Sequence, residues 1–195
     1  MAGRRIAAVR TSTLLRELTV MILDEGFLDV SMADVARRLK CSKASLYGIA
    51  ASKEQLLLTV VRAFFRDATE RVEASLAATT GPMDRIGVYL GAISVELAPA
   101  SPQFFADVDA FAPAREVYRD NTRAAARRVQ ELVAAAAPAA DATFVGAVAG
   151  QVMESIHRGD MRATTGLDDS AAYRSLAELI VAGLSGEHDR RPVGG

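Results

Sequence analysis

The sequence contains no tryptophan and only one cysteine, and aromatic residues make up 6% of its 195 positions. A single cysteine cannot form a disulfide within the chain, and it argues against a cysteine-based zinc site. No apolar run reaches the length of a membrane span, and residues 6–9 are too short to be the core of a signal peptide. These absences predict a cytoplasmic protein, with Cys41 as a small, partly buried hydrophobic residue rather than a redox sensor.

Motifs that support catalysis are absent as well. The sequence has no P-loop, no dinucleotide-binding glycine fingerprint, no cysteine–histidine pairing and no two-histidine helical motif. Asp107 and Asp109 are close in sequence, but a helix would point them to different faces. The sequence therefore predicts a protein that is not an enzyme and that carries neither a cofactor nor a metal.

The residues that are present favour helices, and their charges are unevenly distributed. Half of the residues are hydrophobic, alanine runs such as 134–137 suit close helix packing, and no segment keeps the alternation of a strand. Residues 1–53 hold nine basic and five acidic side chains, whereas residues 54–195 hold 14 basic and 19 acidic ones. A basic head on an acidic body fits a protein that docks one end onto phosphates; a plain solvated surface is the alternative.

Residues 31–58 combine two short helices, a tight turn and the start of a third helix. Ser31 is placed to cap the first helix, and Ser42 opens the second after a three-residue turn. Ser52 caps the third helix, with Gln55 at the reciprocal position of a capping box. This spacing predicts a helix-turn-helix, whose second helix can lie in a major groove of DNA.

These residues resemble the N-terminal domain of the TetR family of bacterial transcriptional repressors. The matching positions run from Gly26-Phe27 to Leu58 and include Ser31, Val35, Ala36, Ser42-Lys43, Leu46-Tyr47 and Ser52-Lys53-Glu54. The chain departs from the family at Lys40, where members usually have a glycine, and at residues 48–50, where they have two further aromatic or bulky residues. About a third of the chain carries the resemblance, and the rest matches only in length and helical character.

The helical patterns along the chain predict about nine helices, and the resemblance implies an all-α fold with two domains. A DNA-binding domain is expected over residues 11–71, with its helix-turn-helix at 31–49, and an effector-binding and dimerisation domain over residues 72–186. Residues 1–10 and 187–195 are expected to be flexible tails.

The ends of the first helix and one loop can also be predicted. Thr11 or Ser12 is expected to cap the first helix, which Gly26 ends. Residues 160–167 are expected to form a loop before the last helix.

The resemblance also implies which residues contact DNA. Some of them present side chains or backbone to the groove and others contact phosphates: Arg4, Arg5, Ser31, Ser42, Lys43, Ala44, Ser45, Tyr47, Gly48 and Lys53. The alternative is that the hydroxyls only cap helices and that the two N-terminal arginines only keep the terminus soluble.

The last two long helices would, by resemblance, pair with their copies in a second subunit. The expected interface residues are Phe144, Ala147, Val148, Gly150, Tyr173, Leu176, Ala177, Ile180 and Leu184. The small residues permit close backbone approach, and the apolar stripe of the last helix needs a partner surface. Burial within one chain is the competing explanation.

An effector cavity is expected between the head and the dimer interface. Its lining would come from Phe65, Tyr89, Phe104, Phe105, Phe111, Tyr118, Met153 and His157. Such a set at helical spacing is also typical of plain core, and His157 is equally well placed as a favourable cation at a helix C-terminus.

The function that these features favour is ligand-responsive repression of transcription. A homodimer would bind a palindromic double-stranded operator and would be released by a small apolar effector. The alternative is an all-helical carrier of a lipid or another small molecule whose head has lost DNA binding.

Overall fold

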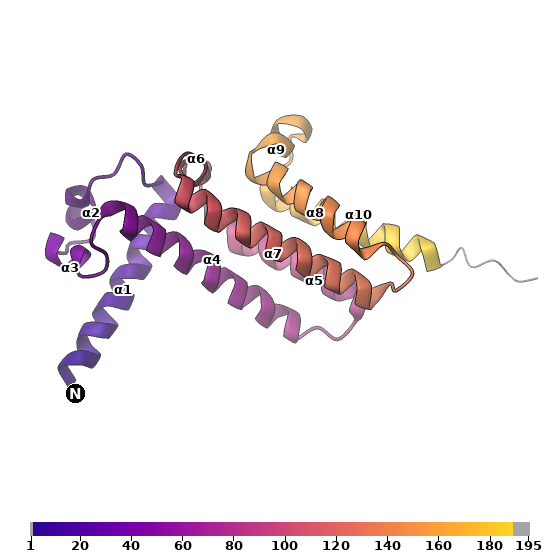
Figure 1. The fold of residues 1–195 in the computed structure, drawn as a ribbon, viewed down its shortest axis with the longest axis horizontal. Coiled ribbons are helices and arrows are strands. Elements are labelled where there is room, and N and C mark those ends of the chain that lie inside the picture. The colour runs from indigo at the N-terminus through magenta and orange to yellow at the C-terminus, as the bar shows by residue number, and fades with distance from the viewer. Residues whose placement is uncertain (1, 189–195) are drawn as a thin grey trace, which may run out of the picture. The chain divides into compact units, whose positions relative to one another are not determined.

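A computed structural model describes the backbone of residues 2–188 and the side chains of residues 11–185, and every regular element in this part is a helix (Figure 1). These residues form ten helices where the sequence predicted about nine. By their internal contacts they divide into two compact units. The first unit holds the residues up to 67 together with 99–118, and the second holds 68–98 together with the residues from 119 on. The sequence instead placed one boundary after residue 71 and assigned everything that follows to a single domain.

The first unit contains the N-terminal helices and a segment from the middle of the chain. Its elements are α1 (Ala2–Glu25), α2 (Met32–Arg38), α3 (Lys43–Tyr47), the first part of α4 (Lys53–Ala77), α6 (Pro102–Ala110) and the start of α7 (Ala112–Ala136). Helix α1 begins before Thr11 and Ser12, so the prediction that one of them caps it is wrong. No proline interrupts residues 2–10, and their alanines propagate the helix. At the other end Gly26 has a φ of +79° and ends α1 as predicted.

The second unit contains the rest of α4 and α7 and four further helices. These are α5 (Pro82–Leu97), α8 (Ala142–His157), α9 (Asp160–Thr165) and α10 (Asp169–His188). Helix α9 lies where the sequence predicted a loop over residues 160–167. Gly159 and Gly166 both adopt a left-handed conformation, which lets the chain turn sharply on either side of this short helix. Helix α10 extends to His188, and the rest of the predicted C-terminal tail lies outside the described residues.

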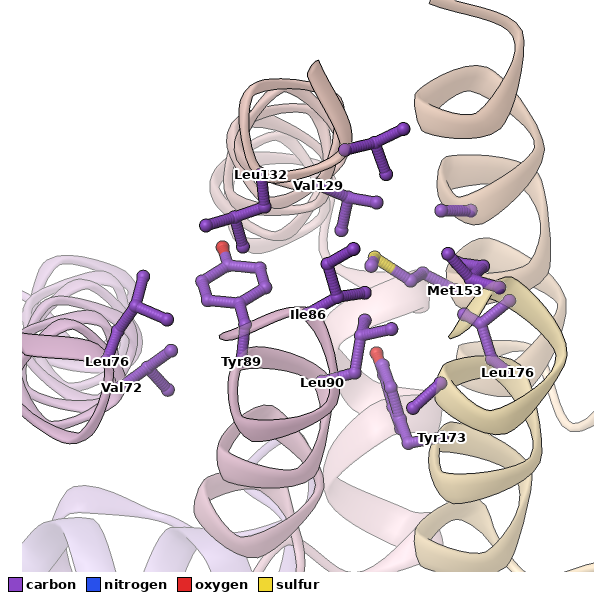
Figure 2. Close-up of a cluster of buried hydrophobic side chains, with 14 of the residues drawn as sticks. Val72, Leu76, Ile86, Tyr89, Leu90, Val129, Leu132, Met153, Tyr173 and Leu176 are labelled. Carbon is purple, nitrogen blue, oxygen red and sulfur yellow. The ribbon is translucent and has the colours of Figure 1, made fainter. Parts of the chain in front are cut away.

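The core of the second unit is built from apolar side chains of five helices. Figure 2 shows side chains of α4, α5, α7, α8 and α10 converging around Ile86 and Leu90, both fully buried. Tyr89 lies in the same core. Burial, together with the nearby Glu73 carboxylate, raises the pKa of its phenol far above the usual range. At the edge, Arg128 donates two hydrogen bonds of 3.0 Å to Glu73 and thereby joins α7 to α4.

The first unit has an aromatic core. Its rings pack at tilted or edge-to-face angles, with centroids 5.0–6.3 Å apart, and come from Phe27, Phe64, Phe65, Phe104, Phe105, Phe111 and Tyr118. Phe27 follows α1 after a single glycine, and it contacts both Phe104 of α6 and Phe111. This core therefore fixes α6 against the segment that leads into α2.

Candidate nucleic-acid interface

Helix α2 starts at the cap that the sequence predicts. The Ser31 hydroxyl accepts the Asp34 amide N–H at 3.2 Å, and the Asp34 carboxylate accepts the Ser31 amide N–H at 3.3 Å. This reciprocal capping box satisfies two amides that the first turn leaves without a helical partner. Val35 and Ala36 are buried, so the helix packs with one face and leaves the other in solvent.

The turn between α2 and α3 is a Schellman motif closed by a lysine. The Cys41 amide donates to the Ala36 carbonyl at 3.0 Å, and the Lys40 amide donates to the Arg37 carbonyl at 3.3 Å. Lys40 has a φ of +48°, and it is the only non-glycine residue with a positive φ among the described residues. Lysine therefore adopts the left-handed conformation that the usual glycine would supply, and the turn keeps its form.

Helix α3 is short and presents most of its side chains to solvent. Ser42 caps it by accepting the Ser45 amide N–H at 3.1 Å, and Leu46 is fully buried, which anchors the helix. Tyr47 is 51% exposed, and all the other predicted groove residues are exposed as well. The exposed set is Lys43, Ala44, Ser45, Tyr47 and Gly48. The helix-turn-helix thus has one anchored face and one face that is open to a ligand.

The basic side chains of this region differ in how they are used. Arg37 pairs with Asp34 in the same helix, and Arg38 pairs with Glu25 of α1. Lys40 and Lys43, in contrast, have no ion-pair partner among the side chains that the structure describes. The sequence counted all the basic residues alike, but the two arginines of α2 are paired, whereas Lys40 and Lys43 are not.

The start of α4 holds the predicted cap at Ser52 and, next to it, the carboxylate of Glu54. Ser52 accepts the Gln55 amide N–H at 3.2 Å, but the Gln55 side chain accepts the N–H of Ala51 rather than that of Ser52. The Glu54 carboxylate accepts a backbone N–H and the Ser52 hydroxyl, and these hydrogen bonds lower its pKa. The Lys53 ammonium donates to the Leu28 carbonyl at 2.6 Å. A phosphate at this helix end would therefore meet Lys53 beside a carboxylate.

The predicted ligand residues fall into two separate groups. Phe65, Phe104, Phe105, Phe111 and Tyr118 belong to the aromatic core of the first unit, whereas Tyr89, Met153 and His157 belong to the second. A surface hollow of about 390 Å³ in the first unit is lined by none of them. Its lining residues are Glu17, Val20, Met21, Leu23, Asp24, Glu25 and Pro99. The assignment of these aromatic residues to an effector cavity stays a prediction.

The predicted dimer residues are only partly at the surface. The stripe of α10 is buried against α5 and α8 of the same chain, and its part in a dimer interface stays a prediction; its residues are Tyr173, Leu176, Ala177, Ile180 and Leu184. Gly150 likewise lies close to the α7 side chain of Ala126. Phe144, Ala147 and Val148 remain exposed on α8. Leu179, which the sequence analysis did not select, is 70% exposed on α10.

Arg4 and Arg5 are the remaining residues that were predicted to contact DNA. Arg4 and Arg5 lie in the first turns of α1, and their side chains are outside the described residues. No helix in the described part has the length and apolarity that crossing a membrane requires. Among the same residues, no three histidine, cysteine or acidic side chains gather as a metal site would need.

Comparisons with known proteins identify this arrangement. Residues 14–60, which contain the whole helix-turn-helix, match the model of bacterial regulatory proteins of the tetR family. Over 65 residues the chain is 34% identical to the HTH-type transcriptional regulator BetI of Agrobacterium fabrum. The N-terminal part of the chain is therefore similar to the DNA-binding domain of TetR-family regulators. The BetI match spans 33% of this chain and about a third, 32%, of that protein.

Solved structures of transcriptional regulators share the fold over most of the chain. A regulator from Streptomyces coelicolor has a TM-score of 0.70 at 19% identity, over 95% of this chain and 96% of its own. A transcriptional regulator from Saccharomonospora viridis in complex with choline has a TM-score of 0.71 at 16% identity, over 89% and 96% of the two chains. At these identities the likeness shows the fold alone, and it covers the helical body as well as the N-terminal residues.

Proposed function

We propose that the protein is a DNA-binding regulator of transcription and that α3 is its recognition helix. The single observation that carries the proposal is the helix-turn-helix itself, which is capped at Ser31 and Ser42, anchored by buried Leu46 and open on the α3 face. A five-residue helix with one apolar anchor can enter a major groove, while Lys40 and Lys43 face phosphates along its rim.

Salt dependence of binding tests this proposal. Log affinity falls as log salt rises, and each lost phosphate contact reduces the magnitude of this slope by about 0.9. Lys43→Ala should therefore reduce the magnitude by about that amount. Lys43→Ala combined with Lys53→Ala should reduce it further, because Lys53 keeps two donor positions beside its bond to the Leu28 carbonyl. The measurement is fluorescence anisotropy of a labelled duplex that the wild-type chain has selected from a random-sequence pool.

A matched control is available in the second unit. Arg123 is an exposed basic residue on α7, paired with Asp120 one turn away, and Arg123→Ala should leave the slope unchanged. An unchanged slope for the two lysine variants would rule out their phosphate contacts. If no duplex is retained in a salt-dependent way, the regulator proposal fails and a helical small-molecule carrier replaces it.

We further propose that the protein acts as a homodimeric repressor that a small effector releases from DNA. The exposed apolar side chains of α8 and α10 support dimerisation, and a two-fold dimer would favour a palindromic operator with half-sites about 34 Å apart. Reversing occupancy from 99:1 to 1:99 requires an effector preference of about 5.5 kcal/mol for the released state. Choline is one compound to test, beside an apolar set, because the S. viridis structure was determined as a choline complex.

A further inference from the structure

Asp107 of α6 is a buried carboxylate that no part of the proposed function uses. It is only 4% exposed, and its Oδ2 accepts the amide N–H groups of Phe27 at 2.5 Å and of Leu28 at 2.9 Å. Its Oδ1 accepts the Gln103 side-chain amide at 2.7 Å. A carboxylate satisfied by three N–H groups in the interior is held in one place, because moving it would leave charge and donors unpaired.

The amides that Asp107 binds lie in the segment between α1 and α2. Phe27 and Leu28 join the end of α1 to Ser31, the residue that caps α2. The Leu28 carbonyl in turn accepts the Lys53 ammonium at 2.6 Å, so the same residue is tied to the start of α4. Asp107 therefore holds the segment from which the helix-turn-helix departs.

Two further contacts show that the fold is built around this carboxylate. A Cβ atom on Gly26 would lie 2.6 Å from Asp107 Oδ2, so the left-handed glycine is what lets the carboxylate approach the backbone. The Ser101 amide at the start of α6 also donates to the Leu23 carbonyl of α1 at 2.8 Å. Helix α6 is therefore hydrogen-bonded to α1 and to the following turn by three separate backbone groups, those of Leu23, Phe27 and Leu28.

We propose that Asp107 is a positioning residue for DNA binding, which holds the helix-turn-helix in the orientation that α3 needs to enter the groove. The proposal rests on the DNA-binding function proposed above. Asp107 contacts no DNA in this proposal. It acts through Phe27 and Leu28 on the helices that follow them. Without Asp107, the helix-turn-helix adopts several orientations, and only one of them lets α3 enter the groove.

The experiment compares three variants in the full-length chain. Asp107→Ala removes the acceptor. Asp107→Asn keeps the shape and an acceptor oxygen for the two amides, provided that the Gln103 amide turns round. Val108→Ala truncates a buried residue of the same helix that makes no such hydrogen bonds, and so serves as the control for lost packing. Urea denaturation first fixes a temperature at which all three variants are folded.

The readouts are DNA affinity, its salt slope, and backbone hydrogen exchange over residues 27–49. For Asp107→Ala we expect about a tenfold higher Kd. This is the increase that results when the fraction of molecules in the DNA-binding orientation falls to about a tenth. Its salt slope should be that of the wild type, because the phosphate contacts in the bound state are the same. Exchange over residues 27–49 should quicken. Asp107→Asn should restore affinity to within about threefold of the wild type, and Val108→Ala should change neither affinity nor exchange over these residues.

Two results would overturn the proposal. One is wild-type affinity and exchange for Asp107→Ala, and the other is an equal loss of affinity for Val108→Ala, which would reduce Asp107 to a packing residue. If the wild type retains no duplex, the proposed function fails on its own account. The exchange measurement then still decides whether Asp107 orders residues 27–49, since faster exchange in Asp107→Ala supports that role and unchanged exchange refutes it.

Discussion

At the scale of single residues, Lys40 shows how a local rule can be broken without loss of the structure. A left-handed conformation costs a residue with a Cβ atom about 1–2 kcal/mol relative to the right-handed one. The two hydrogen bonds of the Schellman motif and the packing of α2 and α3 hold the backbone there regardless. The protein therefore keeps a lysine at this position of the turn at a cost in stability.

Replacing this lysine should stabilise the protein. Lys40→Gly relieves the left-handed strain but adds flexibility to the unfolded chain, so we expect a net gain of about 0.5–1 kcal/mol in the free energy of unfolding. Urea denaturation followed by circular dichroism measures this quantity. Lys40→Ala is the matched control, because it removes the same charge and keeps the Cβ atom. An equal gain for Lys40→Ala would mean that charge repulsion, not backbone strain, was relieved.

The caps of the motif could be predicted from sequence, whereas its ion pairs could not. Ser31, Ser42 and Ser52 accept amides three residues further on, and an interaction over three residues is visible in the sequence. The partner of Arg38 is Glu25, which belongs to another helix. Sequence reasoning had no means of separating this paired arginine from Lys40 and Lys43. It noted Asp107 only as half of a carboxylate pair, because the amides that bind it are some 80 residues away.

At the scale of helices, some glycines of the second unit lie where two helices pack closely, and others lie where a side chain would have room. A Cβ atom on Gly146 of α8 would lie 2.8 Å from the Gln130 Cβ and 3.0 Å from the Ala126 carbonyl oxygen, both on α7. A Cβ atom on Gly87 of α5 would meet nothing within 4 Å. The two glycines therefore have different roles, although both stand inside helices.

Alanine at these two positions should have opposite effects on stability. Gly146→Ala forces α7 and α8 apart and should lower the free energy of unfolding by about 1–3 kcal/mol. Gly87→Ala adds helix propensity without a clash and should raise it by about 0.5–1 kcal/mol. Urea denaturation of both variants checks the pair. If both changes proved stabilising, the contact between α7 and α8 would be looser than the structure shows.

Most helices could be predicted, but what covers them could not. The end of α1 at Gly26 matches the expectation, because a glycine after the last helical residue is a local signal. Helix α9 was missed because six residues between two glycines carry too little periodicity to be distinguished from a loop. The stripe of α10 was seen correctly, yet its periodicity cannot tell whether α5 of the same chain or a second subunit covers it.

At the scale of the whole molecule, one segment is assigned to an unexpected unit. Residues 99–118, which include α6, belong with the helix-turn-helix, although both neighbouring stretches of chain belong to the second unit. The contacts that place α6 there are those of Ser101, Phe104 and Asp107 with residues about 80 positions earlier. Only long-range packing determines such an assignment, and composition and periodicity do not report it.

Assembly is the remaining question at this scale, and exposed apolar residues allow a direct test. Phe144 on α8 and Leu179 on α10 are 66% and 70% exposed, on two helices that pack against each other. Burying a large apolar side chain contributes about 1.5–3 kcal/mol, so leaving both in water is costly unless a second copy covers them. We expect the wild type to sediment as a dimer and the double variant Phe144→Asp with Leu179→Asp to sediment as a monomer.

The control for this test is Val95 of α5, which is 69% exposed and is not on either of those helices. Val95→Asp introduces the same charge and should leave the dimer intact. The monomeric variant should also bind a palindromic duplex far more weakly than the wild type, because the second half-site is then no longer held at high effective concentration. A wild type that sediments as a monomer at micromolar concentration would contradict the dimer, and with it the expectation of a palindromic operator.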